Sequence, residues 1–327
     1  MTVLKRWLIL LEPSRSSLAP LMTLTLFLVQ MLNGLQLGIL LFLVAAGLTL
    51  VFGVMDVINL AHGVQYMLGA YLMVTATALT GSFWLGLPLA LAAALVLGLL
   101  LERLVIRQLY GRDHLDQVLA TFGIILFVSE AVRMVWGSAP LAIPMPHALS
   151  GSVRLMDGLN YPVYRLVLIG AGLGVAGLLY VLVTRTRAGM LLRAGATNAP
   201  MVSALGVDIT ALFARIFAFG AMLAAFAGAM AGPILSVEPG MGDNLLILAF
   251  VVIVIGGIGS MRGAFVAALL VGLIDTLGRS FLTDILKLVM SASAASAAGP
   301  ALASMSVYVL MAAILFFRPR GLFPAPA

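Results

Sequence analysis

The chain has 327 residues, of which 63% are hydrophobic and only 9% are charged, whereas a soluble protein carries about 25% charged residues. This composition excludes a hydrated globular surface and indicates an integral membrane protein, in which the net charge of +6 marks topology rather than a nucleic-acid partner. The sequence contains no cysteine, so a disulfide framework, a thiol nucleophile and cysteine-based metal sites are excluded.

Long, continuously apolar segments predict an all-α polytopic membrane protein with about eight to ten transmembrane helices. A helix needs about 20 apolar residues to cross a bilayer, and the strands of a membrane barrel would instead alternate polar and apolar residues. We expect a single transmembrane domain over residues 1–327, preceded by an N-terminal segment at 1–20. The predicted spans are 24–50, 63–80, 84–101, 117–136, 162–184, 212–233, 244–256, 264–282 and 303–317.

Polar residues interrupt the apolar pattern directly after the first span, at Asp56 and at Asn59-Leu-Ala-His62-Gly63. Irregular backbone at membrane depth has to be buried in protein or line a cavity. The pattern therefore predicts a broken helix beside a translocation pathway. Two alternatives stay open: Asn59 and His62 cap the broken helix ends, and Asp56 caps a turn instead of contacting substrate.

Arginines gather in the connections 102–116 and 185–208 and in the tail at Arg318 and Arg320. The positive-inside rule places these segments in the cytoplasm and the connections 137–161 and 234–243 on the opposite side. The N-terminus conflicts with this scheme, because one crossing at 24–50 leaves its basic residues outside. Either the rule is overridden there or Asn33-Gly34 hides a further turn. The conflicting residues are Lys5, Arg6 and Arg15.

A second glycine-rich interruption, Gly256-Gly257-Ile-Gly259-Ser260, follows the span at 244–256. Paired interruptions in two halves of a transporter point to the transport site. The alternative is two ordinary tight turns. Both interpretations stay open at this point.

Other glycine motifs predict packing. Gly172-Leu-Gly-Val-Ala-Gly177 has the spacing of a dinucleotide-binding loop, but it lies inside an apolar helix instead of after a strand. Glycine pairs four residues apart predict close helix contacts. These pairs are Gly170 and Gly174, Gly228 and Gly232, and Gly259 and Gly263.

Charged residues inside spans occur as pairs. Glu130 and Arg133, and likewise Asp275 and Arg279, share a helix face and can neutralise each other; the functional alternative is a proton relay or a substrate contact. The sequence contains no Gly-Lys-Ser/Thr loop for ATP. We therefore expect no enzyme activity, no metal site and no cofactor on this chain, and any ATP must bind a partner subunit.

Three blocks together resemble the permease subunits of branched-chain amino-acid (Liv-type) ABC importers. They run from Asn33 to Tyr71, from Gly189 to Val207 and from Gly256 to Ala264, and the ending Arg318-Pro-Arg-Gly-Leu-Phe323 is similar as well. The resemblance implies a multi-pass protein of the bacterial inner membrane. Its implied partners are a second permease, homologous or identical, two ABC ATPases that bind ATP, and a periplasmic solute-binding protein.

The two interruptions predict the pathway residues, and the resemblance implies the coupling residues. The expected translocation pathway comprises Asp56, Asn59, His62, Gly63, Gly256, Gly257 and Gly259. The cytoplasmic segment 185–211 is implied to couple to an ATPase through Gly189, Arg193, Ala199, Leu205 and Gly206. Family members commonly have an acidic residue near the start of this segment, where this chain has Asn198-Ala-Pro200, a sequence that still suits a helix start. The stretch from Lys287 to Pro300 is expected to be a divergent insertion on the outer side.

The predicted function is transport by alternating access in an ATP-driven importer of branched-chain amino acids or a related small polar solute. The alternative is an ion-coupled secondary transporter based on Asp56, Glu130 and Asp275. A passive channel and a purely structural membrane subunit are further alternatives. The sequence leaves open a leucine-like substrate, another amino acid, urea, an amide or an aromatic acid.

Overall fold

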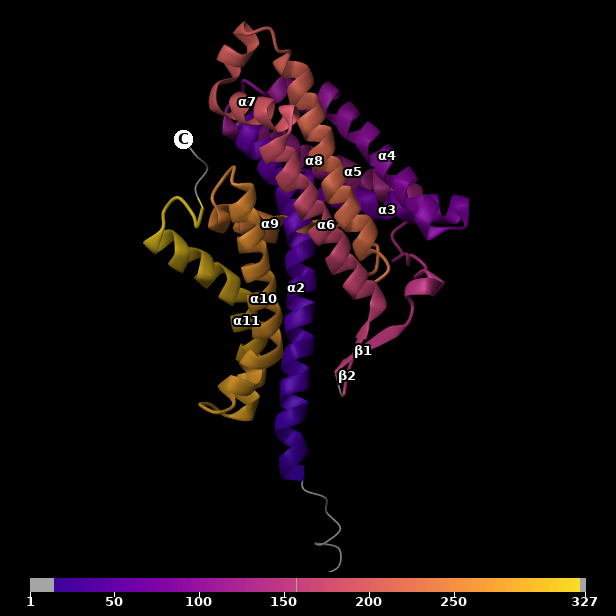
Figure 1. Cartoon of the computed structure of the whole chain (residues 1–327), viewed down its shortest axis with the longest axis vertical. Helices are drawn as coiled ribbons and strands as arrows, with labels where there is room; N and C mark the ends of the chain where they lie inside the picture. Colours follow the sequence, from indigo (N-terminus) through magenta and orange to yellow (C-terminus); the bar gives the residue numbers. More distant parts are fainter. Residues whose placement is uncertain (1–14, 157, 324–327) are drawn as a thin grey trace, which may run out of the picture.

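The computed structural model describes residues 15–156 and 158–323, and it is almost entirely helical (Figure 1). Seven of its helices are long and apolar enough to cross a membrane, and α3 and the short α9 pack in the same bundle. The all-α prediction is therefore confirmed. The helices are α2 (Arg15–Met55), α3 (His62–Thr80), α4 (Phe83–Leu104), α5 (His114–Trp136), α6 (Val163–Arg185), α7 (Arg187–Ala204), α8 (Ile209–Ala231), α9 (Asp243–Gly256), α10 (Met261–Leu286) and α11 (Ala292–Phe317).

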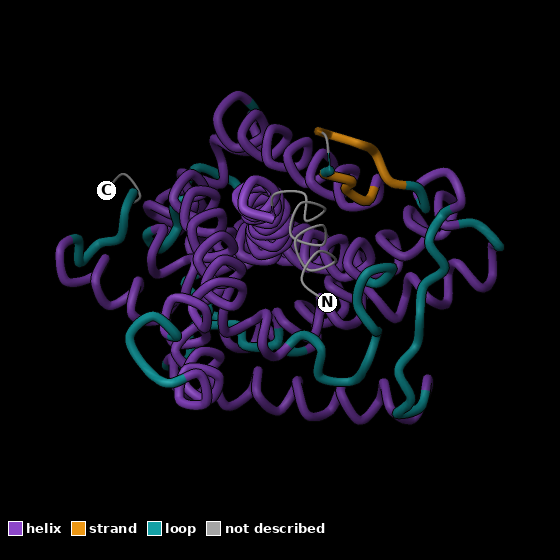
Figure 2. Tube along the Cα trace, turned by 90° about the horizontal axis from the view of Figure 1, so that it is seen from below, coloured by secondary structure: helices purple, strands orange, loops and turns teal. Residues whose placement is uncertain are grey.

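Helix α2 is the central element of the bundle. Its 41 residues extend over about 60 Å at 1.5 Å per residue, twice the thickness of a bilayer core. It packs against α10, α8, α9 and α6, and Figure 2 shows it end-on with the other helices around it. Every residue from Ile39 to Val51 is buried, so the core is built around this stretch.

The helix α2 continues without a turn through Asn33 and Gly34, so a hidden turn there is wrong. Asn33 is instead tied into the bundle, because its Oδ1 accepts hydrogen bonds from Tyr161 and Arg165 at 3.1 and 2.7 Å. The helix begins at Arg15, so the expected boundary at residue 20 lies inside it. Lys5 and Arg6 lie outside the described residues.

The glycine-pair predictions have mixed outcomes. Gly228 lies against the backbone of α3, Gly232 against Ile143, and Gly259 and Gly263 against the backbones of Gly53 and Gly256. The prediction is wrong for Gly170 and Gly174, which have open space where a side chain would stand. On α6 it is Gly172 that makes the close contact, against Ile39 of α2. Helix rotation, which the spacing alone does not specify, decides which glycine faces a neighbour.

Two connections that are far apart in sequence meet at one end of the bundle. Leu141 and Val237 form an antiparallel bridge, with N–H to oxygen distances of 2.8 and 2.9 Å. The connection after α5 also contains one short 3-10 helix, η2 (His147–Leu149), and an antiparallel hairpin, β1 (Ser152–Met156) with β2 (Leu159–Pro162). The structure therefore brings together the two segments that the charge rule predicts to lie on the outer side.

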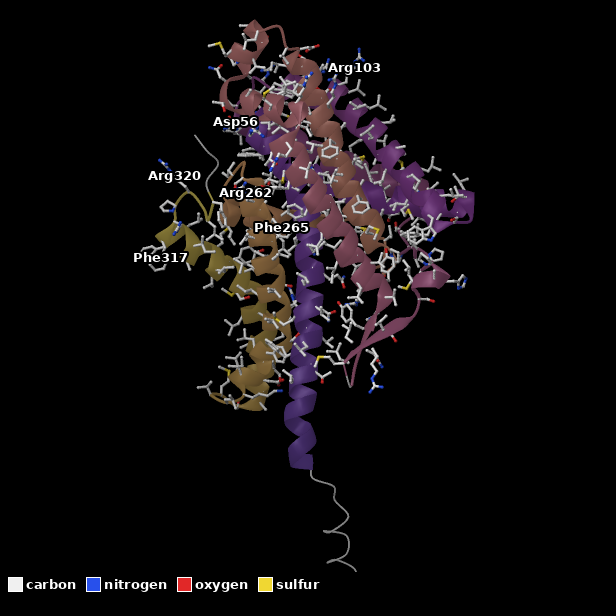
Figure 3. All side chains as sticks on the ribbon, viewed as in Figure 1. Asp56, Arg103, Arg262, Phe265, Phe317 and Arg320 are labelled. Atoms are coloured by element: carbon white, nitrogen blue, oxygen red, sulfur yellow. The ribbon has the colours of Figure 1, made fainter. Side chains whose placement is uncertain are left out.

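Basic residues gather towards the other end. Figure 3 shows Arg103 and Arg262 in the same half of the molecule as α7, with Arg320 on the nearby tail. This distribution agrees with a cytoplasmic placement of these connections. The expected insertion after Lys287 is largely helical, because α11 begins at Ala292 and includes Pro300.

Candidate functional site

The broken segment after α2 turns back into the bundle. Helix α2 ends at Met55, and Asp56 has a φ of 52°, in the left-handed region that aspartate tolerates at a helix end. Its side chain is exposed. After an irregular stretch that ends in a turn at Leu60 and Ala61, α3 begins at His62, whose Nε2 lies 3.0 Å from the carbonyl oxygen of Val44. Val44 is about 16 Å from the end of α2, at 1.5 Å per residue, so α3 begins deep inside the bundle.

Two side chains of α5 satisfy the backbone of this segment. The Ile58 N–H donates to Gln117 Oε1 at 2.9 Å, and the Leu60 N–H donates to Thr121 Oγ1 at 3.2 Å. Gln117 in turn donates to the carbonyl oxygens of Leu109 and Arg112. The sequence interpretation missed both residues, although two polar side chains four residues apart in an apolar helix were the available signal.

Asn59 is the least satisfied polar residue of the segment. It is 0% exposed, and neither its Nδ2 nor its Oδ1 has a hydrogen-bond partner among the described residues. The N-cap of α3 is Ala61, without a side-chain bond, and His62 binds Val44 instead. The capping alternative for Asn59 and His62 is therefore not what the structure shows.

Further buried polar groups lie along α3 and around its first residue. The described residues provide no hydrogen-bond partner for His62 Nδ1, for the Gln65 amide, or for the hydroxyls of Tyr66 and Tyr71. On α2, Thr49 Oγ1 is likewise buried without a partner. Buried polar groups are normally hydrogen-bonded, so such a concentration in one bundle requires a physical explanation.

The second glycine-rich segment is a short turn between α9 and α10. Gly257 and Gly259 have φ values of 103° and 78°, and Ser260 caps α10 by accepting from the Gly263 N–H at 3.1 Å. The C-terminal tail covers the turn, because the N–H groups of Leu322 and Phe323 donate to the carbonyls of Ile255 and Gly256.

The broken segment after α2 runs alongside α9, from its C-terminal end to its N-terminal end. Gly53 packs directly on Gly259 beyond the C-terminus of α9, and Gly63 packs on Gly242 at its N-terminus. The expected pathway residues of the two segments thus share one neighbouring helix. Asp56 lies in the half of the molecule that contains α7 (Figure 3). His62 and Gly63 lie deeper in the bundle, beside Val44 and Gly242.

The expected coupling segment forms α7 (Arg187–Ala204), with non-helical backbone at Asn198. Asn198 Oδ1 accepts from the Met201 N–H at 2.9 Å, so the predicted cap is confirmed. Gly189 packs on the backbone of Leu182 and Val183, and Arg193 donates to the Val183 carbonyl, so these two residues fasten α7 to α6.

The rest of this segment is open to the outside of the chain. Leu205 is 77% exposed, Met201 is also exposed, and Gly206 has nothing within 4 Å of where a Cβ would stand. Ala199 is half-buried between these two parts. Helix α7 lies at the end of the molecule where the basic connections gather (Figures 1 and 3).

A family model described as "Branched-chain amino acid transport system / permease component" matches residues 30–316. The chain belongs to this family. It is 30% identical over 312 residues to the high-affinity branched-chain amino acid transport system permease protein BraD of Pseudomonas aeruginosa, covering 92% of this chain and 96% of that protein.

Two further relatives have similar names and lengths. The LivH permease protein of Escherichia coli K12 is 28% identical over 320 residues, covering 92% of this chain and 96% of that protein. A probable LivH of Methanocaldococcus jannaschii is 29% identical over 253 residues, with coverages of 73% and 76%. No solved structure matches significantly. The resemblance stated from the sequence is thus confirmed, and the chain is a membrane protein of a transport family.

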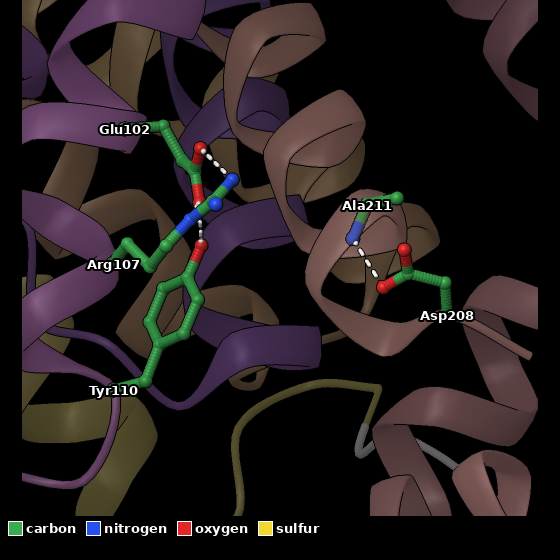
Figure 4. A network of polar contacts seen from close by, with 5 residues as sticks. All are labelled: Glu102, Arg107, Tyr110, Asp208 and Ala211. Atoms are coloured by element: carbon green, nitrogen blue, oxygen red, sulfur yellow. Dashed lines mark hydrogen bonds and ion pairs between the residues drawn. The ribbon is translucent and has the colours of Figure 1, made fainter.

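A charged network joins the end of α4 to the connection that follows it in this permease (Figure 4). Glu102 is fully buried and accepts from Arg107 at 3.2 and 3.1 Å and from the Tyr110 hydroxyl at 2.5 Å. Burial, and then the bond to Glu102, raise the pKa of Tyr110. The Tyr110 ring packs edge-on against Phe213 of α8, the helix that Asp208 caps. The sequence interpretation missed this network.

The two predicted charge pairs of the permease are confirmed. Arg133 lies 2.6 Å from Glu130, and Arg279 lies 2.9 Å from Asp275. Each acid therefore has an opposite charge on its own helix. Two of the three carboxylates on which the ion-coupled alternative rests are thereby neutralised, and the third, Asp56, is exposed.

Proposed function

We propose that this chain is the membrane-spanning permease subunit of an ATP-driven ABC importer in the bacterial inner membrane, and that it moves branched-chain amino acids or a related small polar solute by alternating access. Family membership and the printed function of the relatives support this proposal. The structural observation that carries it is Asn59, whose amide is fully buried and has no hydrogen-bond partner in the part of the chain that the structure describes.

An unpaired buried amide costs roughly 2–7 kcal/mol relative to water. In a purely structural subunit nothing offsets this cost. In a transporter the same group meets water or solute when the bundle opens, so the cost is confined to the closed arrangement. The proposed route is therefore bordered by the two interruptions, at Asp56, Asn59, His62, Gly63, Gly256, Gly257 and Gly259.

The proposed partners are a second permease subunit, two ATPase subunits and a periplasmic solute-binding protein. ATP binds the ATPases, and this chain binds no cofactor. Helix α7 docks on an ATPase through its exposed end at Leu205 and Gly206, while Gly189 and Arg193 transmit the movement to α6. A purified sample of the chain alone should hydrolyse no ATP, and turnover by a contaminant-free sample would contradict the subunit assignment.

The route is tested with single cysteines at Asn59 and His62, because the chain has no native cysteine. In an assembled, transporting complex, a water-soluble thiol reagent should label both positions, and trapping ATP on the partners should change the labelling rate. Ala45→Cys, at a fully buried apolar position of α2, is the control that should stay unlabelled. Gly63 is omitted because a side chain there would strike Gly242. Absence of labelling at Asn59 and His62 in every state would place the route elsewhere.

A further inference from the structure

An open pocket lies at the end of the bundle opposite the basic connections. It has a volume of about 290 Å³ and is lined by Arg133, Ser138, Glu238 and Pro239. Ligand sites in proteins begin at about 300 Å³, so the space suits one small molecule. Its walls come from the end of α5 and from the connection between α8 and α9, the two segments that the charge rule predicts to face the outside.

Hydrogen bonds fix both walls of the pocket. The Leu141–Val237 bridge joins the two connections just beside it. The Trp136 Nε1–H donates to Thr75 Oγ1 at 2.8 Å, which ties the end of α5 to α3, and the Gly240 N–H donates to Met67 Sδ at 3.3 Å. The pocket is therefore built on the framework of the bundle and not on a free loop.

The two charged side chains of the pocket have opposite signs and spare bonding capacity. Arg133 uses one nitrogen, Nη1, for Glu130, and a guanidinium has five N–H donors. Glu238 is exposed and makes no ion pair among the described residues. A positive fork and a free carboxylate in one small pocket match the carboxylate and the ammonium group of a zwitterion.

The pocket also leads towards the proposed route along α3. Beside it lies Tyr71, whose ring packs on Trp136 at the end of α5 and whose buried hydroxyl has no partner among the described residues. One turn further along α3 is Met67, which contacts Gly240, and a further turn away is Gly63, which packs on Gly242. The connection 238–242 therefore follows the same face of α3 from the pocket to the broken segment.

We propose that this pocket is the outer mouth of the route and a binding site for a zwitterionic α-amino acid, whose carboxylate binds Arg133 and whose ammonium group binds Glu238. This inference rests on the proposed function and deepens it, because it assigns two recognition groups to the permease itself. It also predicts that recognition at this site depends on both charges of the solute and little on its side chain.

The test uses Ser138→Cys in the assembled complex of permease and ATPases, without the binding protein. L-leucine should slow the reaction of this cysteine with a cationic thiosulfonate reagent. Ala148→Cys, an exposed position outside the pocket, is the control that leucine should not protect. L-leucinamide lacks the carboxylate and isocaproate lacks the ammonium group, so each should protect at least about tenfold less well, as expected for one lost charge-assisted contact.

Two variants test which charged group of the solute each side chain binds. In Glu238→Gln, leucine should protect no better than isocaproate, and in Arg133→Gln it should protect no better than leucinamide. Asp284→Asn, which changes an exposed carboxylate paired with Lys287, is the matched control. In this variant, protection by leucine, leucinamide and isocaproate should be the same as in the parent.

The outcomes separate this inference from the proposed function. If the complex with the parent permease transports leucine but leucine does not protect Ser138→Cys, the pocket assignment is wrong and the permease function stands. Equal protection by leucine and leucinamide in the parent would identify a site for cations and would overturn the zwitterion proposal. A complete complex with active ATPases that transports neither an amino acid nor a related small polar solute would contradict the proposed function itself.

Discussion

The Nε2 atom of His62 lies 3.0 Å from the carbonyl oxygen of Val44, although the two residues belong to different helices. A carbonyl oxygen only accepts hydrogen bonds, so Nε2 carries the hydrogen. In the neutral ring Nδ1 is then an acceptor, and it has no partner among the described residues. His62, the first residue of α3, thus binds the backbone of α2 through Nε2, and its Nδ1 is left as a hydrogen-bond acceptor.

Gly47 makes room for this contact and gives the first prediction. A Cβ at Gly47 would stand 2.8 Å from His62 Nε2 and 2.5 Å from the Gly220 carbonyl oxygen. Gly47→Ala should therefore destabilise the permease by about 1–3 kcal/mol, as overpacking does, and lower its midpoint of thermal unfolding in detergent. Gly174→Ala, where a Cβ meets nothing within 4 Å, is the control. Equal midpoints for the two variants would contradict the packing described here.

The sequence predicted well which residues form helices. It did not predict how deep in the bundle a helix such as α3 begins. Residues 84–101 were expected to span the membrane, and α4 covers Phe83–Leu104, because a continuous apolar run is a local property. The return of the chain from Asp56 to the level of Val44 depends on tertiary contacts. No sequence pattern in residues 56–61 shows how far this irregular segment runs back alongside α2.

The partners of the broken segment illustrate the same limit. Asn59 and His62 stand out in an apolar run, so they were found from the sequence. Gln117 and Thr121 satisfy the backbone of that segment from 59 and 61 positions away. Their role follows only from the packing of α5 beside the break. The close contact of Gly172, in place of Gly170 and Gly174, depends in the same way on the rotation of α6.

Gln117 gives the second prediction. Gln117→Leu removes the acceptor of the Ile58 N–H and the donor to two carbonyls, and each buried group left unpaired costs about 1–3 kcal/mol. The variant should unfold at a lower temperature and lose transport as the break loosens. Gln108→Leu removes an exposed amide and should change the stability by less than about 0.5 kcal/mol. A Gln117→Leu variant as stable as Gln108→Leu would show that α5 does not hold the break.

Tyr110 gives a prediction about pH. Its raised pKa means that the folded permease keeps the phenol proton when an unfolded chain, with a tyrosine pKa near 10, has lost it. This stabilisation is fully present below about pH 10 and is lost as the pH rises further. Tyr110→Phe should therefore be less stable than the parent at neutral pH, and the difference should shrink above about pH 10.

Thermal unfolding between neutral pH and pH 11 measures this difference. Tyr308→Phe, which removes the hydroxyl of a tyrosine that is 43% exposed, controls for the loss of a phenol. A stability difference between the parent and Tyr110→Phe that stays constant across the whole range would show that the Glu102 bond does not retain the proton.

The exposed end of the coupling segment gives the last prediction. Gly206 has a φ of 87°, and a Cβ there meets nothing within 4 Å. Any other residue pays a backbone cost of about 1–2 kcal/mol in this conformation, but even a large side chain points away from the chain. Gly206→Ala and Gly206→Trp should therefore unfold at similar temperatures. Only tryptophan adds bulk to the surface that we propose to dock on an ATPase, so it should reduce transport by at least about tenfold relative to alanine and abolish the stimulation of ATP hydrolysis by solute. If Gly206→Trp transports at the rate of Gly206→Ala, this end of α7 does not couple the permease to an ATPase.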